Sequence, residues 1–125
     1  MKLLITGSRY VNPAMISYAK RVVARAKALD WSVIVGDANG IDATVIAECD
    51  KLGVSVEVHG AYGKLRHSTL TGKNLIHSGD YSNRDCSMAE LCDTCMAIWD
   101  GKSRGTEATF GYAKLVGKQV FVQKF

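Results

Sequence analysis

The sequence predicts a single α/β domain of three layers, with a parallel sheet between two layers of helices. Short apolar runs alternate with helical patterns along the whole chain, and 125 residues is a usual length for one domain. Strands that alternate with helices imply right-handed crossovers. The runs are almost continuously apolar, which is typical of strands buried on both faces. We therefore expect a Rossmann-like sheet of about five strands over residues 1–125.

The first half of the chain predicts three strands joined by two helices. Asn12 and Pro13 supply a cap and a first residue for the first helix. Its apolar positions recur every three or four residues as far as Leu29. The second helix begins at Ile41 and is ended by Gly53. The three strands are expected at Lys2–Thr6, Trp31–Val35 and Val54–Val58.

The second half predicts two more strands and two more helices. Met88 and Cys92 lie on a third helix, and a fourth runs from Ala108 to Val116 before Gly117. The strands are expected at Thr94–Trp99 and Gln119–Gln123.

The segment from His59 to Tyr81 has no strong periodicity. A structureless segment of this length is often a lid or a binding loop. As a lid, it would close its basic residues over phosphates, and Tyr62 or Tyr81 would stack on a base. The alternative is a short helix near Leu70–Ile76.

The composition favours a small anionic ligand over a nucleic acid. The formal net charge is only +4, and the basic residues are scattered rather than gathered in a stripe. The first residues carry too short an apolar run for a signal peptide, and no stretch reaches membrane-spanning length. We therefore expect a cytoplasmic protein without membrane contact, whose four cysteines stay reduced.

Glycines and small polar residues follow three of the expected strands. Glycine lets the backbone approach a phosphate, and the helix that follows offers free amides and a positive dipole end. In a parallel sheet these turns meet at the carboxyl edge, where ligands bind. Neither the dinucleotide nor the P-loop fingerprint is present. The turns are Gly7-Ser8-Arg9, Gly36-Asp37-Ala38-Asn39-Gly40-Ile41-Asp42 and Gly101-Lys102-Ser103-Arg104-Gly105-Thr106-Glu107.

The cysteines and histidines do not predict a metal site. Cys92 and Cys95 have redox-like spacing, but they fall at the end of a helix rather than at its start, where the dipole would lower a thiol pKa. Cys86 is the only nearby further ligand, so buried structural cysteines are favoured over zinc. The three histidines have no metal-like spacing. We expect no metal and no required cofactor.

The order of these motifs resembles the SLOG superfamily, which joins the DNA-processing protein A (Smf) domain to the Lonely Guy (LOG) phosphoribohydrolases. Besides the three turns, the resemblance rests on Asn83-Arg84 followed by Met88, and on Cys92-Asp93. It covers essentially the whole chain and is strongest for the small stand-alone members of bacteria and phages. It implies a pocket for nucleotides or NAD-derived molecules such as ADP-ribose, and commonly a dimer, for which the apolar faces of the third and fourth helices are available.

One departure from the related hydrolases favours binding over catalysis. The resemblance matches Arg84, Gly105 and Thr106 to the phosphate pocket, but Thr109 stands where those enzymes carry a glutamate needed to cleave the N-glycosidic bond. Glu107 lies on a different side of the helix. A sensor or sequestering protein is therefore the first hypothesis. A nucleotide N-glycosidase using Arg84 and Glu107 is the second, and single-strand DNA binding is the least favoured.

Asp42 is expected either to bond a ribose hydroxyl or to brace the start of the second helix. The expected ligand-binding residues are Gly7, Ser8, Arg9, Gly36, Asp37, Ala38, Asp42, Asn83, Arg84, Ser103, Arg104, Gly105 and Thr106.

Overall fold

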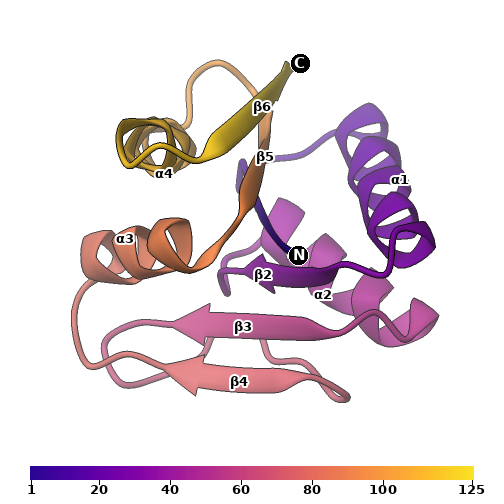
Figure 1. The fold of residues 1–125 in the computed structure, drawn as a ribbon, viewed down its shortest axis with the longest axis horizontal. Helices are drawn as coiled ribbons and strands as arrows, with labels where there is room; N and C mark the ends of the chain where they lie inside the picture. Colours follow the sequence, from indigo (N-terminus) through magenta and orange to yellow (C-terminus); the bar gives the residue numbers. More distant parts are fainter.

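A six-stranded parallel sheet runs through the protein, with α1 and α2 on one face and α3 and α4 on the other (Figure 1). The computed structural model describes all 125 residues. The strand order is β4-β3-β2-β1-β5-β6, so the predicted α/β class is confirmed, with one strand more than expected. The strands are β1 (Lys2–Gly7), β2 (Ser32–Val35), β3 (Val56–Gly60), β4 (Lys73–Ile76), β5 (Thr94–Trp99) and β6 (Gln119–Lys124). The helices are α1 (Pro13–Ala28), α2 (Ile41–Leu52), α3 (Tyr81–Leu91) and α4 (Arg104–Leu115).

The additional strand, β4, lies inside the segment expected to be a lid or a short helix. It pairs in parallel with β3 at the edge of the sheet, and all four of its side chains are exposed. Such an edge strand buries neither face, so its sequence carries no apolar run. The segment before it is held by Asp50 at the end of α2, which accepts hydrogen bonds from the backbone of Leu70 and from the Thr71 hydroxyl (2.9 Å each). The short helix near Leu70–Ile76 was therefore the wrong alternative.

The residues just before each helix determine the conformation of the turn that leads into it. The Asn12 side chain accepts from the Met15 amide (2.9 Å) and caps α1 as predicted. Helix α3 begins earlier than its apolar pattern indicates, because Asp80 caps it through the Asn83 amide (2.8 Å). Gly40 precedes α2 with a φ of +82°, and a side chain there would collide with the backbone of the β1–α1 turn. Two of the ligand-facing turns are thus packed directly on each other.

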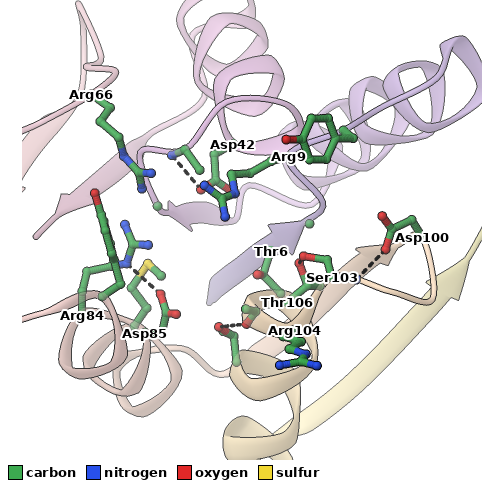
Figure 2. Close-up of a pocket in the computed structure, with 18 of the residues that line it drawn as sticks. Thr6, Arg9, Asp42, Arg66, Arg84, Asp85, Asp100, Ser103, Arg104 and Thr106 are labelled. Atoms are coloured by element: carbon green, nitrogen blue, oxygen red, sulfur yellow. Dashed lines mark hydrogen bonds and ion pairs between the residues drawn. The ribbon is translucent and has the colours of Figure 1, made fainter.

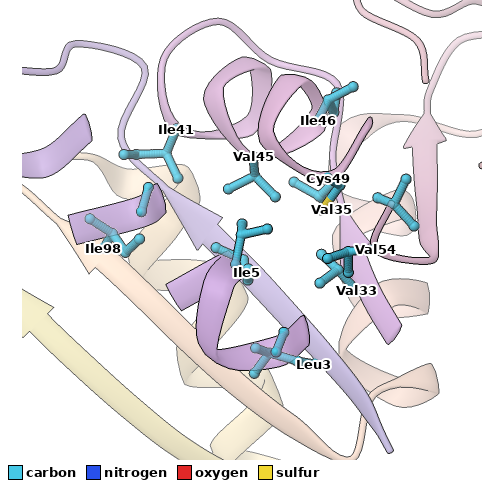
Figure 3. Close-up of a cluster of buried hydrophobic side chains, with 14 of the residues drawn as sticks. Leu3, Ile5, Val33, Val35, Ile41, Val45, Ile46, Cys49, Val54 and Ile98 are labelled. Carbon is cyan, nitrogen blue, oxygen red and sulfur yellow. The ribbon is translucent and has the colours of Figure 1, made fainter. Parts of the chain in front are cut away.

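The core has two parts, one on each face of the sheet. Figure 3 shows the larger part between the sheet and the α1–α2 layer, where Ile5, Val35 and Val45 are fully buried. The smaller part packs α3 and α4 on the other face and includes Cys92 and Cys95. Burial raises the pKa of the Cys95 thiol to about 12, which suppresses the reactive thiolate. Both cysteines therefore pack as apolar residues, as expected. No helix has the length and apolarity that a membrane span requires.

Candidate functional site

A cavity of about 540 Å³ opens at the carboxyl edge of the sheet, where β1 and β5 lie side by side. The strand order reverses there, because β1 continues through α1 to β2 on one side and β5 continues through α4 to β6 on the other. Ligands of open α/β sheets bind at this kind of switch in strand order. The volume falls within the roughly 300–1,000 Å³ usual for small-molecule sites. The position and the size both agree with a ligand pocket.

The structure brings most of the expected ligand-binding residues to this cavity. The expected residues that line it are Gly7, Arg9, Gly36, Ala38, Asp42, Arg84, Ser103, Arg104, Gly105 and Thr106. The lining also includes Arg66 and Tyr81, which belong to the segment considered as a lid. Further lining residues were not expected at the site from the sequence, namely Thr6, Tyr10, Asp85, Met88, Asp100, Lys102 and Thr109.

Three expected residues do not line the cavity. Ser8 is fully buried, and its hydroxyl accepts a hydrogen bond from the Asp100 amide (3.1 Å), which ties two turns together. Asp37 is buried behind the cavity wall. Asn83 is exposed on the first turn of α3. The alternative catalytic residue Glu107 is also exposed and lies outside the lining. Polar residues in a turn can face the ligand or the neighbouring backbone, and the sequence does not separate the two.

One wall of the cavity is an ion-pair network centred on Asp37. Its carboxylate accepts from the Arg84 Nη1 (2.9 Å), from the Arg66 Nη2 (2.8 Å) and from the Arg66 amide (2.8 Å). Burial opposes ionisation of Asp37, but the bonds from the two arginines outweigh it, so its pKa is lowered. Arg84 also donates to the His59 carbonyl (2.8 Å) and, through Nε, to Asp85 (2.7 Å). The Arg84 guanidinium is therefore held in one orientation.

Tyr81 supports the same wall with its ring. The Arg66 guanidinium lies 4.3 Å from the ring centre and that of Arg84 lies 5.2 Å from it, which is cation–π geometry. Tyr62 meets the Tyr81 ring edge-on. These contacts occupy the aromatic groups expected to stack on a base. Tyr10, which is 87% exposed at the rim of the cavity, is instead the free aromatic ring.

The first turn of α4 forms the facing wall (Figure 2). Asp100 accepts from the amides of Lys102 and Ser103 (2.8 Å each), which fixes the turn before the helix and lowers the pKa of Asp100. A Cβ added to Gly105 would meet nothing within 4 Å, so space is open beside the helix start. The amides of a first helical turn lack intrahelical acceptors. This wall therefore offers unused donors to an anion.

Asp42 and Asp85 bring two further carboxyl groups to the cavity. Asp42 is 7% exposed and accepts from the Ala38 amide (3.1 Å), so it braces the turn before α2 as well as lining the cavity. Burial raises the pKa of Asp42 to about 7, and burial also raises the pKa of Asp85. A side chain at Gly36 would come within 2.7 Å of the Asp42 carboxyl and 3.0 Å of Arg84. Because position 36 is a glycine, the Asp42 carboxyl and the Arg84 guanidinium can both lie close to the backbone there.

The histidines pair outside this cavity. The buried His59 places its Nδ1 2.8 Å from Nε2 of His77, and the rings stack. The pairing follows from the parallel alignment of β3 with β4, which had no sequence signal. His67 bonds the side chain of Asn39 (2.7 Å).

Solved structures of other proteins share this fold. No protein-family model matches the sequence, and no curated protein matches it. The molybdenum cofactor binding protein of Rippkaea orientalis has a TM-score of 0.85 and 13% identity over 99% of this chain and 76% of its own. The molybdenum cofactor carrier protein of Chlamydomonas reinhardtii has a TM-score of 0.83 and 15% identity over 97% of this chain and 74% of its own.

DNA processing protein A of Streptococcus pneumoniae is also similar, with a TM-score of 0.77 and 17% identity. The match covers 97% of this chain but 49% of that protein, so this chain spans about half its length. All three share the fold of this chain, and that fold agrees with the one that the resemblance in the sequence implies.

Proposed function

We propose that this SLOG-fold domain binds a nucleotide or an NAD-derived phosphate ligand in the cavity, as a sensor or sequestering protein. The observation that carries the proposal is the first turn of α4, whose amides lack intrahelical acceptors and which faces Arg84 across one cavity. An anion there would meet free amides, the Ser103 and Thr106 hydroxyls and the Arg104 guanidinium. These donors suit a phosphate group better than an uncharged ligand.

The rest of the cavity suits the remainder of such a ligand. Asp42 and Asp85 offer carboxyl groups to the sugar or to a second phosphate, and Tyr10 offers an exposed ring to the base. Arg9 also lines the cavity, where its guanidinium can approach a phosphate. The solved structures of molybdenum cofactor proteins support small-molecule binding by this fold.

The proposal is tested by titration calorimetry against AMP, ADP-ribose, cyclic ADP-ribose, NAD and the molybdenum cofactor. Adenosine is the matched control, because it keeps the base and the sugar of AMP but lacks the phosphate. We expect a phosphate-bearing compound to bind and adenosine to bind at least tenfold more weakly. Equal affinities for AMP and adenosine, or no heat with any compound, would reject the proposal.

A second candidate, cleavage of the N-glycosidic bond of a nucleotide, is favoured by the placement of Asp85. Thr109 lines the same cavity, and its hydroxyl donates to the Gly105 carbonyl (2.9 Å). The carboxylate missing at position 109 is thus supplied to the same cavity from α3. Chromatography for free base after incubation with nucleoside monophosphates tests this activity. Release that is lost in Asp85→Asn and kept in Glu107→Gln would establish it, and absence of release would reject it.

For assembly, we propose a homodimer formed through the outer surfaces of α3 and α4. Leu91 and Leu115, at the ends of these helices, are 47% and 81% exposed. Sedimentation at the mass of one chain across micromolar concentrations would reject the dimer.

A further inference from the structure

Three carboxyl groups and two guanidinium groups meet at the Asp37 wall of the cavity. Asp37 accepts from both Arg66 and Arg84, and Asp85 accepts from the Nε of Arg84. These contacts pair the two positive charges with two negative ones. Asp42 is the third carboxyl, and it has no lysine or arginine nitrogen within 4.0 Å.

Few groups of the protein stabilise a negative charge on the Asp42 carboxyl. Its one hydrogen bond comes from the Ala38 amide (3.1 Å), which reaches Oδ2 and leaves Oδ1 for the cavity. Arg84 favours its ionised form, whereas Asp85 and Asp37 disfavour it. The charge of Arg66 also interacts with Asp42. The other charged residues that line the cavity are Arg9, Asp100, Lys102 and Arg104. Burial outweighs the favourable contacts and raises the pKa of Asp42 to about 7.

An anionic ligand changes this balance further. A phosphate bound at the first turn of α4 adds negative charge to the cavity that Asp42 lines. An ionised Asp42 would repel it, whereas a protonated Asp42 would donate a hydrogen bond to a phosphate oxygen. Gly36 keeps the space beside Asp42 and Arg84 free of side-chain atoms. Ligand and carboxyl can therefore come into contact.

We propose that Asp42 is a specificity-determining residue that takes up a proton when the ligand binds and donates it in a hydrogen bond to a ligand phosphate. The inference rests on the proposed function and adds the chemistry of one contact. The proton comes from solvent and moves to the free carboxyl oxygen of Asp42, and no bond of the ligand is broken. Ligands that present an acceptor oxygen to Asp42 are selected over ligands that present only donors.

The sign of the pH dependence follows from the linkage between proton binding and ligand binding. Asp42 titrates near 7 in the free protein, and a bound phosphate raises its pKa further. The affinity for the ligand is therefore highest well below pH 7 and falls as the pH rises above 7. For one coupled proton we expect a loss of about fivefold between pH 7 and pH 8, and about tenfold over the next unit. A ligand that donates to Asp42 through a hydroxyl would favour the ionised form and reverse the sign.

The test is titration calorimetry with ADP-ribose in two buffers that differ in ionisation enthalpy. ADP-ribose lacks a phosphate monoester, whose second ionisation near pH 6 would add its own pH dependence. In the wild-type protein we expect uptake of about half a proton at pH 7, rising towards one at pH 8. Asp42→Asn should bind without proton uptake and with an affinity that is flat above pH 7. Asp30→Asn, at an exposed residue remote from the cavity, is the matched control.

The outcomes separate the two proposals. Binding by the wild-type protein without proton uptake, or uptake that persists in Asp42→Asn, would overturn the assignment of the proton to Asp42 and leave the proposed function standing. No binding of ADP-ribose or of any other phosphate compound would reject both. If Asp42→Asn does not fold, carbon-13 NMR of the wild-type carboxyl decides the question. Titration near pH 7 in the free protein that shifts upwards with ADP-ribose is expected, and an unshifted titration would overturn the inference.

Discussion

The wall around Asp37 and the wall formed by the first turn of α4 both carry arginines, but only the first has its charges paired within the protein. Arg84 is 6% exposed and bonded on several sides, whereas Arg104 is exposed and takes part in no ion pair. One wall is therefore built before any ligand arrives, and the other keeps its donors free. Substitutions at the first wall should act on stability, and substitutions at the second should act on binding.

The largest expected effect is on folding, through Asp37→Asn. It leaves the buried Arg84 without its main carboxylate, and breaking a buried pair from one side costs about 3–5 kcal/mol. Urea unfolding should show a loss near the low end of that range, since Asp85 remains bonded to Arg84. Arg66→Ala removes the more exposed partner of the same network and should cost about 1 kcal/mol. Similar losses for both variants would contradict a wall stabilised by burial.

The opposite result is expected at Arg104. Arg104→Ala should weaken binding of a phosphate ligand by about 1.5–3 kcal/mol, the usual worth of hydrogen bonds to charged groups. It should change the free energy of unfolding by less than about 0.5 kcal/mol, because the side chain is exposed. Calorimetry and urea unfolding on the same sample measure both quantities. Lys20→Ala, on the exposed face of α1, controls for the loss of one positive charge.

Asp42 should make the protein less stable as the pH rises. Its pKa is about 7 in the folded protein and about 3.9 in an unfolded chain, so the folded state binds more protons between these values. The free energy of unfolding therefore falls as the pH rises from about 4 to 7. Asp42→Asn removes this cost and should gain about 1–2 kcal/mol at pH 8, with a smaller gain at pH 5. An equal gain at both values would mean that charge burial is not the cause.

The last comparison takes one glycine from each wall. Gly105→Ala places its Cβ in open space, so it should raise stability by about 0.5 kcal/mol and weaken phosphate binding by crowding the ligand. Gly36→Ala places its Cβ 2.7 Å from the Asp42 carboxyl, so it should lower stability by about 1–3 kcal/mol. Thermal unfolding without ligand measures the effect of each variant on stability, and the further shift with ligand measures its effect on binding. Tighter ligand binding by Gly105→Ala would show that the ligand does not approach this turn.

Most of the fold could be predicted because each central strand is apolar and ends at a glycine-bearing turn. The exception, β4, is an edge strand with exposed side chains, and its position depends on pairing with β3. The site was harder to predict because, as for β4, the position of several of its residues depends on contacts between distant parts of the chain. Asp85 reaches the cavity only because Asp80 starts α3 ahead of its apolar positions, and Arg66 reaches it across 29 residues of sequence to bond Asp37. Tertiary placement of this kind has no local signal.

The bond between the Arg66 amide and the buried Asp37 carboxylate has a consequence for the motion of the cavity rim. Arg66 lies in a surface segment outside the named helices and strands, where a backbone amide would normally exchange its hydrogen with water quickly. Here the exchange has to wait until the segment leaves Asp37, which also uncovers a site for cleavage by trypsin after Arg66. The exchange rate of this one amide, compared with and without ligand, would therefore report how often the cavity opens and whether the bound molecule keeps it shut.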